Sequence, residues 1–280
     1  MKKIGFADYY LSEWHADNYP AWFLQASRKL ELEYKFSYAW AERDISPVSG
    51  ESTDEWCERM GVERCMTLAE LCEKSDVIVV LAPSNPEKHL EYAKEVFSYK
   101  KPTYIDKTFA SNLETALQIF KAAEEYGTPF FSSSALRYSE ELNEVRGTRN
   151  IILTGGGSNL EEYLIHQVEM AVSLLQDPVK RAKVETLGNQ YVCHVETKNN
   201  AKAAIIYSNP LEFSVTAQLE NGQTVHKKIE SPFFVHLIED MLQFFETGKA
   251  CFDSQETLEV MRMRDLILKA VRCDGEWVYI

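Results

Sequence analysis

The run VIVVLA at residues 77–82 is the feature that most restricts what this chain can fold into. Its first four residues are all β-branched, and no polar residue alternates with them. A strand of this composition is stable only when both of its faces are covered, as in a parallel sheet that lies between two layers of helices. The chain therefore needs a buried central strand.

The rest of the first half supplies neighbours for that strand. Short apolar runs alternate with amphipathic stretches, which is the pattern of a doubly wound parallel sheet. Further strands are expected at residues 3–7, 35–41, 103–106 and 129–132. Helices are expected where apolar residues recur every three or four positions, at residues 17–30, 67–74, 86–99 and 112–126. We therefore predict a Rossmann-type, dinucleotide-binding domain over residues 1–132.

From about residue 183 the pattern changes to longer strands without helices between them. Asn221 and Gly222 form a hairpin-type turn between two of these strands. The chain then ends with two expected helices, at residues 233–246 and 255–271. Residues 133–280 are thus predicted to form a C-terminal α+β domain with a mostly antiparallel sheet, which serves substrate binding and oligomerisation.

Composition excludes several classes of function. The chain has 43 acidic and 30 basic residues, a formal charge of -13, which disfavours binding to nucleic acid. No apolar stretch is long enough for a signal peptide core or a membrane span. The six cysteines are scattered and form no C-x-x-C pair, which indicates free thiols in a reducing compartment. We expect a cytoplasmic protein without a membrane partner.

Three segments resemble the glucose-fructose oxidoreductase and inositol 2-dehydrogenase (Gfo/Idh/MocA) family. The family's strand with a T-P-x-x-x-H-like turn is matched from Pro83 to His89, and its E-K-P motif is matched by Asp106-Lys107-Thr108. The segment GGGSNLEEYLIHQVEM is similar to the family's G-G-G-x-x-x-D-x-G-x-H-x-x-D motif. The tail from residue 253 is similar to the family's closing helix. Together these segments span most of the chain.

The resemblance implies an NAD(P)-dependent oxidoreductase that acts on a sugar, a polyol or a related hydroxy compound. It assigns the catalytic lysine to Lys107, the aspartate's place to Glu162 and the histidine's place to His166. Alcohol oxidation needs a base for the hydroxyl proton, and histidine titrates near neutral pH. Glu162 and His166 lie four positions apart, on one face of an expected helix. Lys107 and His166 are expected to converge in one cleft between the domains.

Each of these residues also has a structural interpretation. Lys107 is alternatively a solvated lysine at a strand end, and His166 is alternatively a packing residue paired with Glu162. A metal site of Glu162, His166 and Glu169 is a further alternative, but no second helix offers matching ligands, so we expect no metal.

For the cofactor, the resemblance and the position of each residue predict six contacts, namely Gly5, Ala7, Glu42, Pro83, His89 and Arg137. His89 is alternatively one residue of an amphipathic helix face, and Arg137 is alternatively structural. Glu42 follows the second strand, where an acidic residue holds the ribose hydroxyls, which favours NAD over NADP. The turn from Gly5 to Tyr10 has lost two of the three usual glycines and gained Asp8, which argues against strong phosphate binding.

Three functions remain open from the sequence. The first is the oxidoreductase with a small-molecule substrate. The second is a non-catalytic ligand-binding or regulatory protein on the same fold, and the third is a glycoside-cleaving enzyme with a tightly held cofactor. The cluster Trp14, His15, Tyr19 and Trp22 either packs the first helix or lines a remodelled pocket. A sheet covered on one side only would need a partner, so we expect a homodimer or homotetramer.

Overall fold

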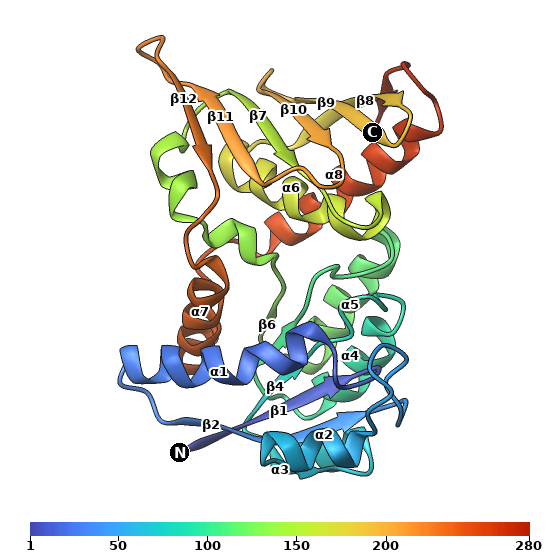
Figure 1. The fold of residues 1–280 in the computed structure, drawn as a ribbon, viewed down its shortest axis with the longest axis vertical. Coiled ribbons are helices and arrows are strands. Elements are labelled where there is room, and N and C mark those ends of the chain that lie inside the picture. Colours follow the sequence, from blue (N-terminus) through green and yellow to red (C-terminus); the bar gives the residue numbers. More distant parts are fainter. The chain divides into compact units, whose positions relative to one another are not determined.

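The protein divides into two compact units. The structure, a computed structural model, describes all residues from 1 to 280 (Figure 1). Unit 1 comprises Met1–Ser133 and Phe234–Ser254, and unit 2 comprises Ser134–Phe233 and Gln255–Ile280. The expected division after residue 132 differs from this one in a single segment, residues 234–254, which group with the first unit.

Unit 1 is built on a six-stranded sheet in the order β3-β2-β1-β4-β5-β6, in which every pair of neighbours is parallel. This confirms the predicted Rossmann-type sheet. The strands are β1 (Lys2–Asp8), β2 (Tyr34–Ala41), β3 (Glu63–Arg64), β4 (Val77–Val80), β5 (Thr103–Ile105) and β6 (Phe130–Phe131). All four residues of β4 are buried, as its β-branched composition requires.

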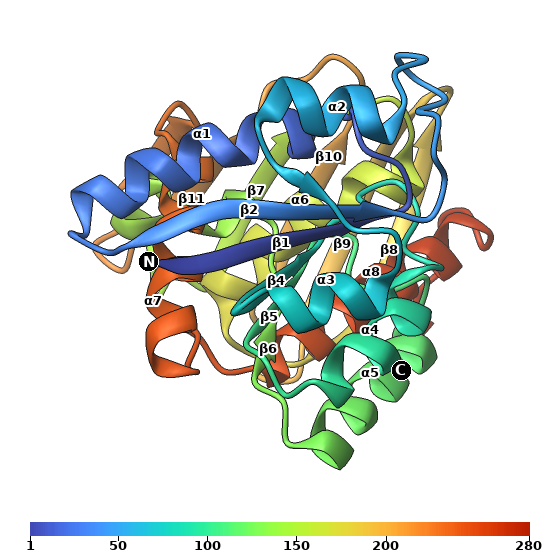
Figure 2. The same cartoon turned by 90° about the horizontal axis from the view of Figure 1, so that it is seen from below.

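Helices cover both faces of this sheet, as Figure 2 shows. One face carries α1 (Trp14–Lys29) and α2 (Thr53–Met60), and the other carries α3 (Leu68–Lys74), α4 (His89–Ser98) and α5 (Leu113–Tyr126). The helix α2, which we did not predict, starts with a capping box of Ser52 and Glu55 and ends at Gly61 in the left-handed conformation.

The helix α7 (Phe233–Thr247) explains why the chain returns to unit 1. The ring of Phe244 packs edge to face on Phe131 of β6 at 4.8 Å, and Glu239 pairs with Lys29 of α1 at 2.7 Å. An amphipathic pattern shows that a helix has an apolar face but not which sheet that face covers. The sequence therefore predicted this helix and not its unit.

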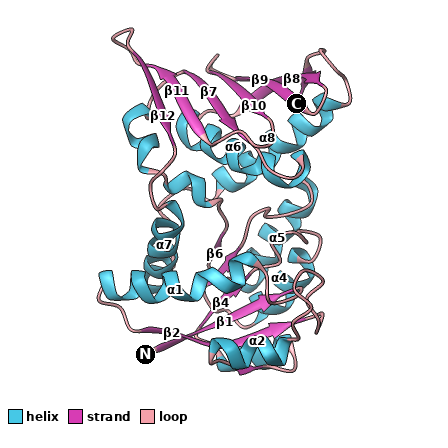
Figure 3. Ribbon diagram, viewed as in Figure 1, coloured by secondary structure: helices cyan, strands magenta, loops and turns pink.

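Unit 2 contains a seven-stranded sheet in the order β12-β11-β7-β10-β9-β8-β13. Its strands are β7 (Asn150–Gly155), β8 (Val179–Leu187), β9 (Gln190–Thr197), β10 (Lys202–Tyr207), β11 (Ser214–Gln218), β12 (Thr224–Lys228) and β13 (Val278–Tyr279). Only the pair β7 and β10 is parallel, which confirms a mostly antiparallel sheet (Figure 3).

Two helices, α6 (Leu160–Leu175) and α8 (Gln255–Val271), contact each other and the strands β7, β8 and β10. The crossover from β7 to its parallel neighbour β10 contains α6, because a parallel pair cannot be joined by a tight turn. Two short 3-10 helices, η1 (Ala135–Tyr138) and η2 (Glu140–Val145), precede β7.

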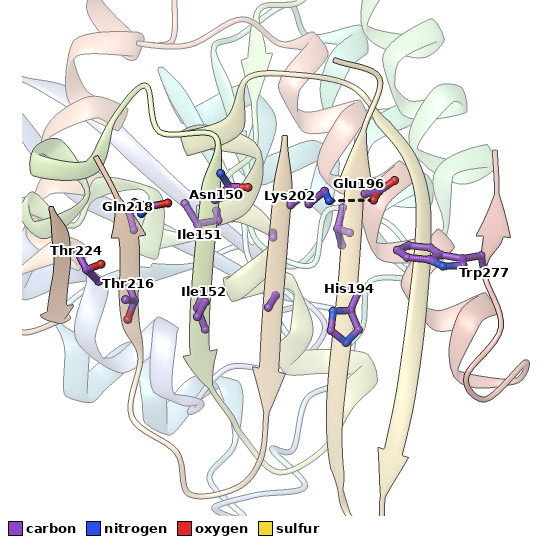
Figure 4. A pocket seen from close by; sticks show the side chains of 14 residues that line it. Asn150, Ile151, Ile152, His194, Glu196, Lys202, Thr216, Gln218, Thr224 and Trp277 are labelled. Atoms are coloured by element: carbon purple, nitrogen blue, oxygen red, sulfur yellow. Dashed lines mark ion pairs between the residues drawn. The ribbon is translucent and has the colours of Figure 1, made fainter. Parts of the chain in front are cut away.

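The sheet of unit 2 presents a shallow hollow on which part-exposed side chains stand, shown in Figure 4. Ile152, His194 and Thr216 come from three different strands there, and Trp277 lies at its border. Ile152 is 44% exposed although its neighbours in β7, Ile151 and Leu153, are buried. This face therefore carries apolar surface in contact with solvent.

No helix in the protein combines the length and the apolar composition that a membrane span requires. All six cysteines are free thiols.

Candidate active site

The carboxyl ends of β1, β4 and β5 bring chemically active residues to one edge of the sheet in unit 1. The strand β1 ends at Asp8, β4 is followed by Leu81 to Pro83, and β5 is followed by Asp106 and Lys107. Open parallel sheets bind their ligands at this edge.

Asp8 lies at the tip of β1 and is only 1% exposed. Its Oδ1 accepts hydrogen bonds from the backbone amides of Tyr9 at 2.7 Å and Ala82 at 3.0 Å. Burial, together with the nearby negative charge of Glu13, raises the pKa of Asp8 well above its usual value. The Oδ2 atom has no hydrogen-bond partner. Asp8 is therefore a buried acid whose protonated form the fold favours.

Glu13 occupies the N-terminus of α1. Its carboxylate accepts from the backbone amides of His15 at 2.9 Å and Ala16 at 2.5 Å, which makes it the N-cap of the helix. Its Oε2 also lies 3.2 Å from Nδ1 of His15. The amides at a helix N-terminus are the usual ligands of a bound phosphate. Here a carboxylate of the chain itself takes them.

Asp106 is held by hydroxyl groups. Its Oδ1 accepts from Tyr19 and from Tyr104, both at 3.1 Å, and its Oδ2 lies 3.7 Å from Nε2 of His15. Burial and the charge of Asp106 raise the pKa of Tyr19 well above its usual value, so this phenol stays protonated and donates. Asp106 thus orients the strand end that carries the next residue, Lys107.

Lys107 has a nearly buried side chain, 7% exposed, whose Nζ lies 3.5 Å from the carbonyl oxygen of Pro83. That distance is at the limit of a hydrogen bond, so the ammonium is held loosely. His89 lies between the two adjoining loops, with its Nε2 2.7 Å from Leu81 O and its Nδ1 3.0 Å from Phe109 O, and the neutral ring donates to one of these two carbonyl oxygens. Burial lowers the pKa of His89. Both of its ring nitrogens face the backbone.

Glu42, the residue expected to hold the ribose, already has two partners from α4 and the turn before it. Its Oε1 accepts from Lys88 Nζ at 2.6 Å, and its Oε2 accepts from the hydroxyl of Tyr92 at 2.7 Å. Burial opposes its charge, but these two hydrogen bonds lower the pKa of Glu42 overall. The same Lys88 lies 5.4 Å from the centroid of the Tyr9 ring. Glu42 is therefore engaged within unit 1.

Gly5 and Ala7 lie inside β1, so the turn that follows the strand begins later than the sequence suggested. A Cβ placed on Gly5 would collide with Ser75 Oγ and lie 3.0 Å from Leu71 Cδ1. Gly5 is thus required where α3 packs closely on β1, and it is not a turn glycine. The turn itself starts at Tyr9 and contains no glycine before α1.

These observations test the fit of a dinucleotide. Its pyrophosphate needs free amides in the turn and at the helix N-terminus. The carboxyl groups of Asp8 and Glu13 take the amide of Tyr9 after β1, the amide of Ala82 after β4 and two amides at the N-terminus of α1, and Asp8 is buried. In this conformation the residues do not fit a pyrophosphate.

His166 lies in unit 2, on the second turn of α6. Its Nδ1 lies 2.7 Å from Oγ of Ser134, which also accepts from the amide of Leu136 at 3.3 Å. When Nδ1 carries the proton and donates to Ser134, the other ring nitrogen, Nε2, is the unprotonated one and has the lone pair of a base. Ser134 is the partner that the sequence did not reveal, because only the fold brings residues 134 and 166 together.

The other two residues expected in unit 2 have structural partners. Oε2 of Glu162 accepts from Asn159 Nδ2 at 3.1 Å, beside the N-cap of α6. Arg137, 6% exposed, pairs with Glu169 at 2.5 Å and with Glu256 at 2.7 Å. Burial opposes the charge of Arg137, but these carboxylates raise its pKa. Arg137 thus has structural partners in unit 2, and Glu169 is one of them; the contact of Arg137 with a cofactor stays a prediction.

Comparisons by sequence found no matching family model and no matching curated protein. Solved structures do match. They include an enzyme of gentamicin A biosynthesis in complex with NAD (14% identity, TM-score 0.76, 100% of this chain and 97% of that chain). An aldose-aldose oxidoreductase from Caulobacter crescentus matches at 13% identity and TM-score 0.75, with both chains fully covered. The UDP-N-acetylglucosamine 3-dehydrogenase of Acidithiobacillus ferrooxidans matches at 11% identity and TM-score 0.76, over 97% and 98% of the chains.

The chain has the fold of the sugar dehydrogenases. Many of the matching structures are dehydrogenases of the Gfo/Idh/MocA type, so the resemblance inferred from the motifs is confirmed as a shared fold. At 11–15% identity the comparison establishes architecture, and the chemistry has to be argued from the residues.

Proposed function

We propose that the protein is an oxidoreductase that transfers a hydride between a nicotinamide cofactor and a small hydroxy compound, such as a sugar or a polyol. The proposal is supported by the shared fold, since two of the matching structures are named as an aldose-aldose oxidoreductase and a UDP-N-acetylglucosamine 3-dehydrogenase, and a third is in complex with NAD. Their names favour an enzyme over a non-catalytic protein on the same fold.

The position of Lys107 carries the proposal. It is a nearly buried ammonium directly after β5, at the sheet edge where parallel α/β proteins hold their ligands. Asp106 and His89 fix the strand end and the loops around it through side chains that are themselves buried. A positive charge there stabilises the oxygen of a bound alcohol as that oxygen loses its proton.

His166 is the proposed proton acceptor. Oxidation of an alcohol removes a hydride from carbon, which the nicotinamide accepts when bound, and a proton from oxygen, which a base must accept. With Nδ1 turned to Ser134, Nε2 of His166 provides that base. Glu162, one helical turn earlier, is proposed to influence the protonation of His166 through its charge.

The proposed cofactor is NAD or NADP, with NAD favoured. Glu42 supplies the acidic side chain after β2 that suits ribose hydroxyls and repels a 2′-phosphate. Contacts from Pro83 and Ala7 to the cofactor remain predictions. The matching structures include one in complex with NAD.

The test combines cofactor binding with turnover. NAD and NADP reduction would be followed by absorbance with a panel of aldoses and polyols, for the wild type, Lys107→Met, His166→Asn and the double variant. Each single substitution should lower turnover by about a hundredfold or more, and the double variant should lose little beyond the worse single one.

Two variants serve as matched controls. Lys94→Met removes an exposed lysine from α4, and His194→Asn removes a histidine from the sheet face of unit 2. Both should keep wild-type turnover. Losses from Lys107 and His166 that multiply would disprove their joint role. A folded protein that reduces neither cofactor with any hydroxy compound would disprove the oxidoreductase proposal.

A further inference from the structure

Side chains of unit 1 make hydrogen bonds that a bound dinucleotide would otherwise make. Phosphates in this kind of fold are bound by amides of the turn after β1 and by amides at the N-terminus of the first helix. Here the Asp8 carboxyl holds the amides of Tyr9 and Ala82, and the Glu13 carboxylate holds the amides of His15 and Ala16. Carboxyl groups thus stand in both positions that a pyrophosphate would use.

A third internal hydrogen bond takes the place of one to the ribose. An acidic residue after β2 normally accepts hydrogen bonds from ribose hydroxyls. In this protein Glu42 accepts from the hydroxyl of Tyr92 at 2.7 Å and from Lys88 at 2.6 Å. A phenol hydroxyl therefore makes the hydrogen bond that a ribose hydroxyl would make.

The carboxyl groups of Asp8 and Glu13 and the ring of Tyr92 are shielded from water, whereas Glu42 is exposed. Asp8 is 1% exposed, Glu13 is 9% exposed and Tyr92 is 2% exposed. The groups around the Asp8 carboxyl are backbone amides, the acidic Glu13 and the phenol of Tyr92, none of which is a cation. Such a buried acid is stabilised chiefly by the amides it holds, so it competes with any other anion for the same amides.

We propose that unit 1 keeps its own dinucleotide site closed, with Asp8 and Glu13 in place of the pyrophosphate and Tyr92 in place of a ribose hydroxyl. A nicotinamide dinucleotide binds only when it displaces the Asp8 carboxyl from the amides of Tyr9 and Ala82. This inference rests on the proposed function, because it concerns the cofactor of that reaction. The affinity for the cofactor then depends on how strongly the Asp8 carboxyl group holds these two amides.

Two causes of weak cofactor binding can be separated by substitution of Asp8. One is that its side chain occupies the backbone amides, and the other is that its negative charge repels the phosphates. Asp8→Asn cannot carry a charge but keeps a side-chain oxygen that still accepts from the same two backbone amides. Asp8→Ser removes both the charge and the reach of the side chain. If occupancy closes the site, Asp8→Ser opens it and Asp8→Asn leaves it closed.

Isothermal titration calorimetry with NAD, and separately with inorganic pyrophosphate, tests this on the full chain. Asp8→Ser should lower the Kd for NAD by about tenfold or more, whereas Asp8→Asn should stay within about threefold of the wild type. Glu125→Ser, which removes an exposed carboxylate from α5, is the charge-matched control and should leave Kd unchanged. Thermal unfolding establishes that each variant is folded.

A second variant protects the test against misfolding at position 8. Tyr92→Phe removes only the hydroxyl that occupies Glu42, and it should also tighten NAD binding. Equal gains from Asp8→Asn and Asp8→Ser would overturn the inference, because charge would then be the cause. Wild-type binding of NAD that neither Asp8→Ser nor Tyr92→Phe improves would overturn it as well.

Failure of the closed-site inference and failure of the proposed function give different results in these titrations. If Asp8→Ser binds pyrophosphate more tightly than the wild type but no variant binds NAD, the closed site is supported and the dinucleotide reaction is disproved. If folded Asp8→Ser binds neither probe more tightly than the wild type, the closed site itself is disproved.

Discussion

Replacing Gly5 by alanine tests the role that the structure gives to this glycine. The added Cβ would collide with Ser75 Oγ and would lie 3.0 Å and 3.1 Å from Cδ1 and Cγ of Leu71. Gly5 lies in the middle of β1, so the collision forces α3 away from the sheet. We expect Gly5→Ala to reduce the stability of unit 1 without any direct effect on a ligand.

The magnitude follows from these contacts. Adding a methyl group to a closely packed core costs about 1–3 kcal/mol. Ser75 Oγ is the atom that Cβ approaches most closely, and it is buried without a hydrogen-bond partner. Ser75→Ala therefore removes the collision without breaking a hydrogen bond. The two remaining contacts, to Leu71, need a shift of only a few tenths of an ångström. The double variant should thus recover more than half of the loss.

Urea unfolding followed by tryptophan fluorescence is the appropriate assay. Four of the five tryptophans, at positions 14, 22, 40 and 56, lie in unit 1, so replacing Trp277 by phenylalanine gives a signal from that unit alone. With a slope of about 1–3 kcal/mol per molar urea, the expected loss lowers the midpoint by roughly 1 M.

The reasoning would be refuted if Gly5→Ala unfolded at the same urea concentration as the parent protein. It would also be refuted if Ser75→Ala gave no recovery in the Gly5→Ala background. Either result would mean that the approach of α3 to β1 is not what requires a glycine at this position.

Three further predictions concern other parts of the chain. Arg137→Met should destabilise unit 2 by about 3–5 kcal/mol, because it leaves the Glu169 carboxylate buried, and Arg137→Met with Glu169→Met should recover part of the loss in urea unfolding followed by far-UV circular dichroism, which reports both units. The raised pKa of Asp8 means that its protonated form stabilises the fold below the usual aspartate pKa and that this stability is lost as pH rises through the raised pKa. The free energy of unfolding of the wild type should therefore fall, relative to that of Asp8→Asn, as pH rises above the usual aspartate pKa, and parallel pH profiles would contradict the assignment. The apolar sheet face of unit 2 predicts self-association, so light scattering should give at least a dimer that Ile152→Lys weakens, and a monomer of 32.2 kDa at micromolar concentration would exclude it.

The sequence predicted the fold well where local pattern and burial agree. The β-branched run of β4 can only be a covered strand, and α8 begins and ends at the predicted residues, 255 and 271. It failed to predict β7, whose sequence NIILTG leads directly into glycines, and it failed to predict α2, whose apolar positions are few. Those elements are stabilised by partners that are distant in the sequence, such as β10 for β7.

The candidate site was predicted less completely, because its contacts depend on three dimensions. Lys107 and His166 could be assigned by motif, but Ser134, Tyr104 and Tyr92 could not, since each meets its partner only through the fold. The lost glycines were visible in the sequence. That Asp8 turns inward and takes the backbone amides was not, because the sequence does not show whether a carboxyl group at the end of a strand faces solvent or the interior.

The two segments of unit 1 have a consequence for biosynthesis. The ribosome completes residues 1–133 about 100 residues before it begins α7, which packs on Phe131 and Lys29. At about 5–20 residues per second, synthesis of the intervening residues takes several seconds or more, and during that time the nascent sheet lacks this helix. A fragment that stops at residue 133 would lack α7, so the surface that this helix covers in unit 1 would stay exposed to solvent. A shortened chain that joins residue 133 to residues 234–254 through a flexible linker would instead supply every element of the first unit.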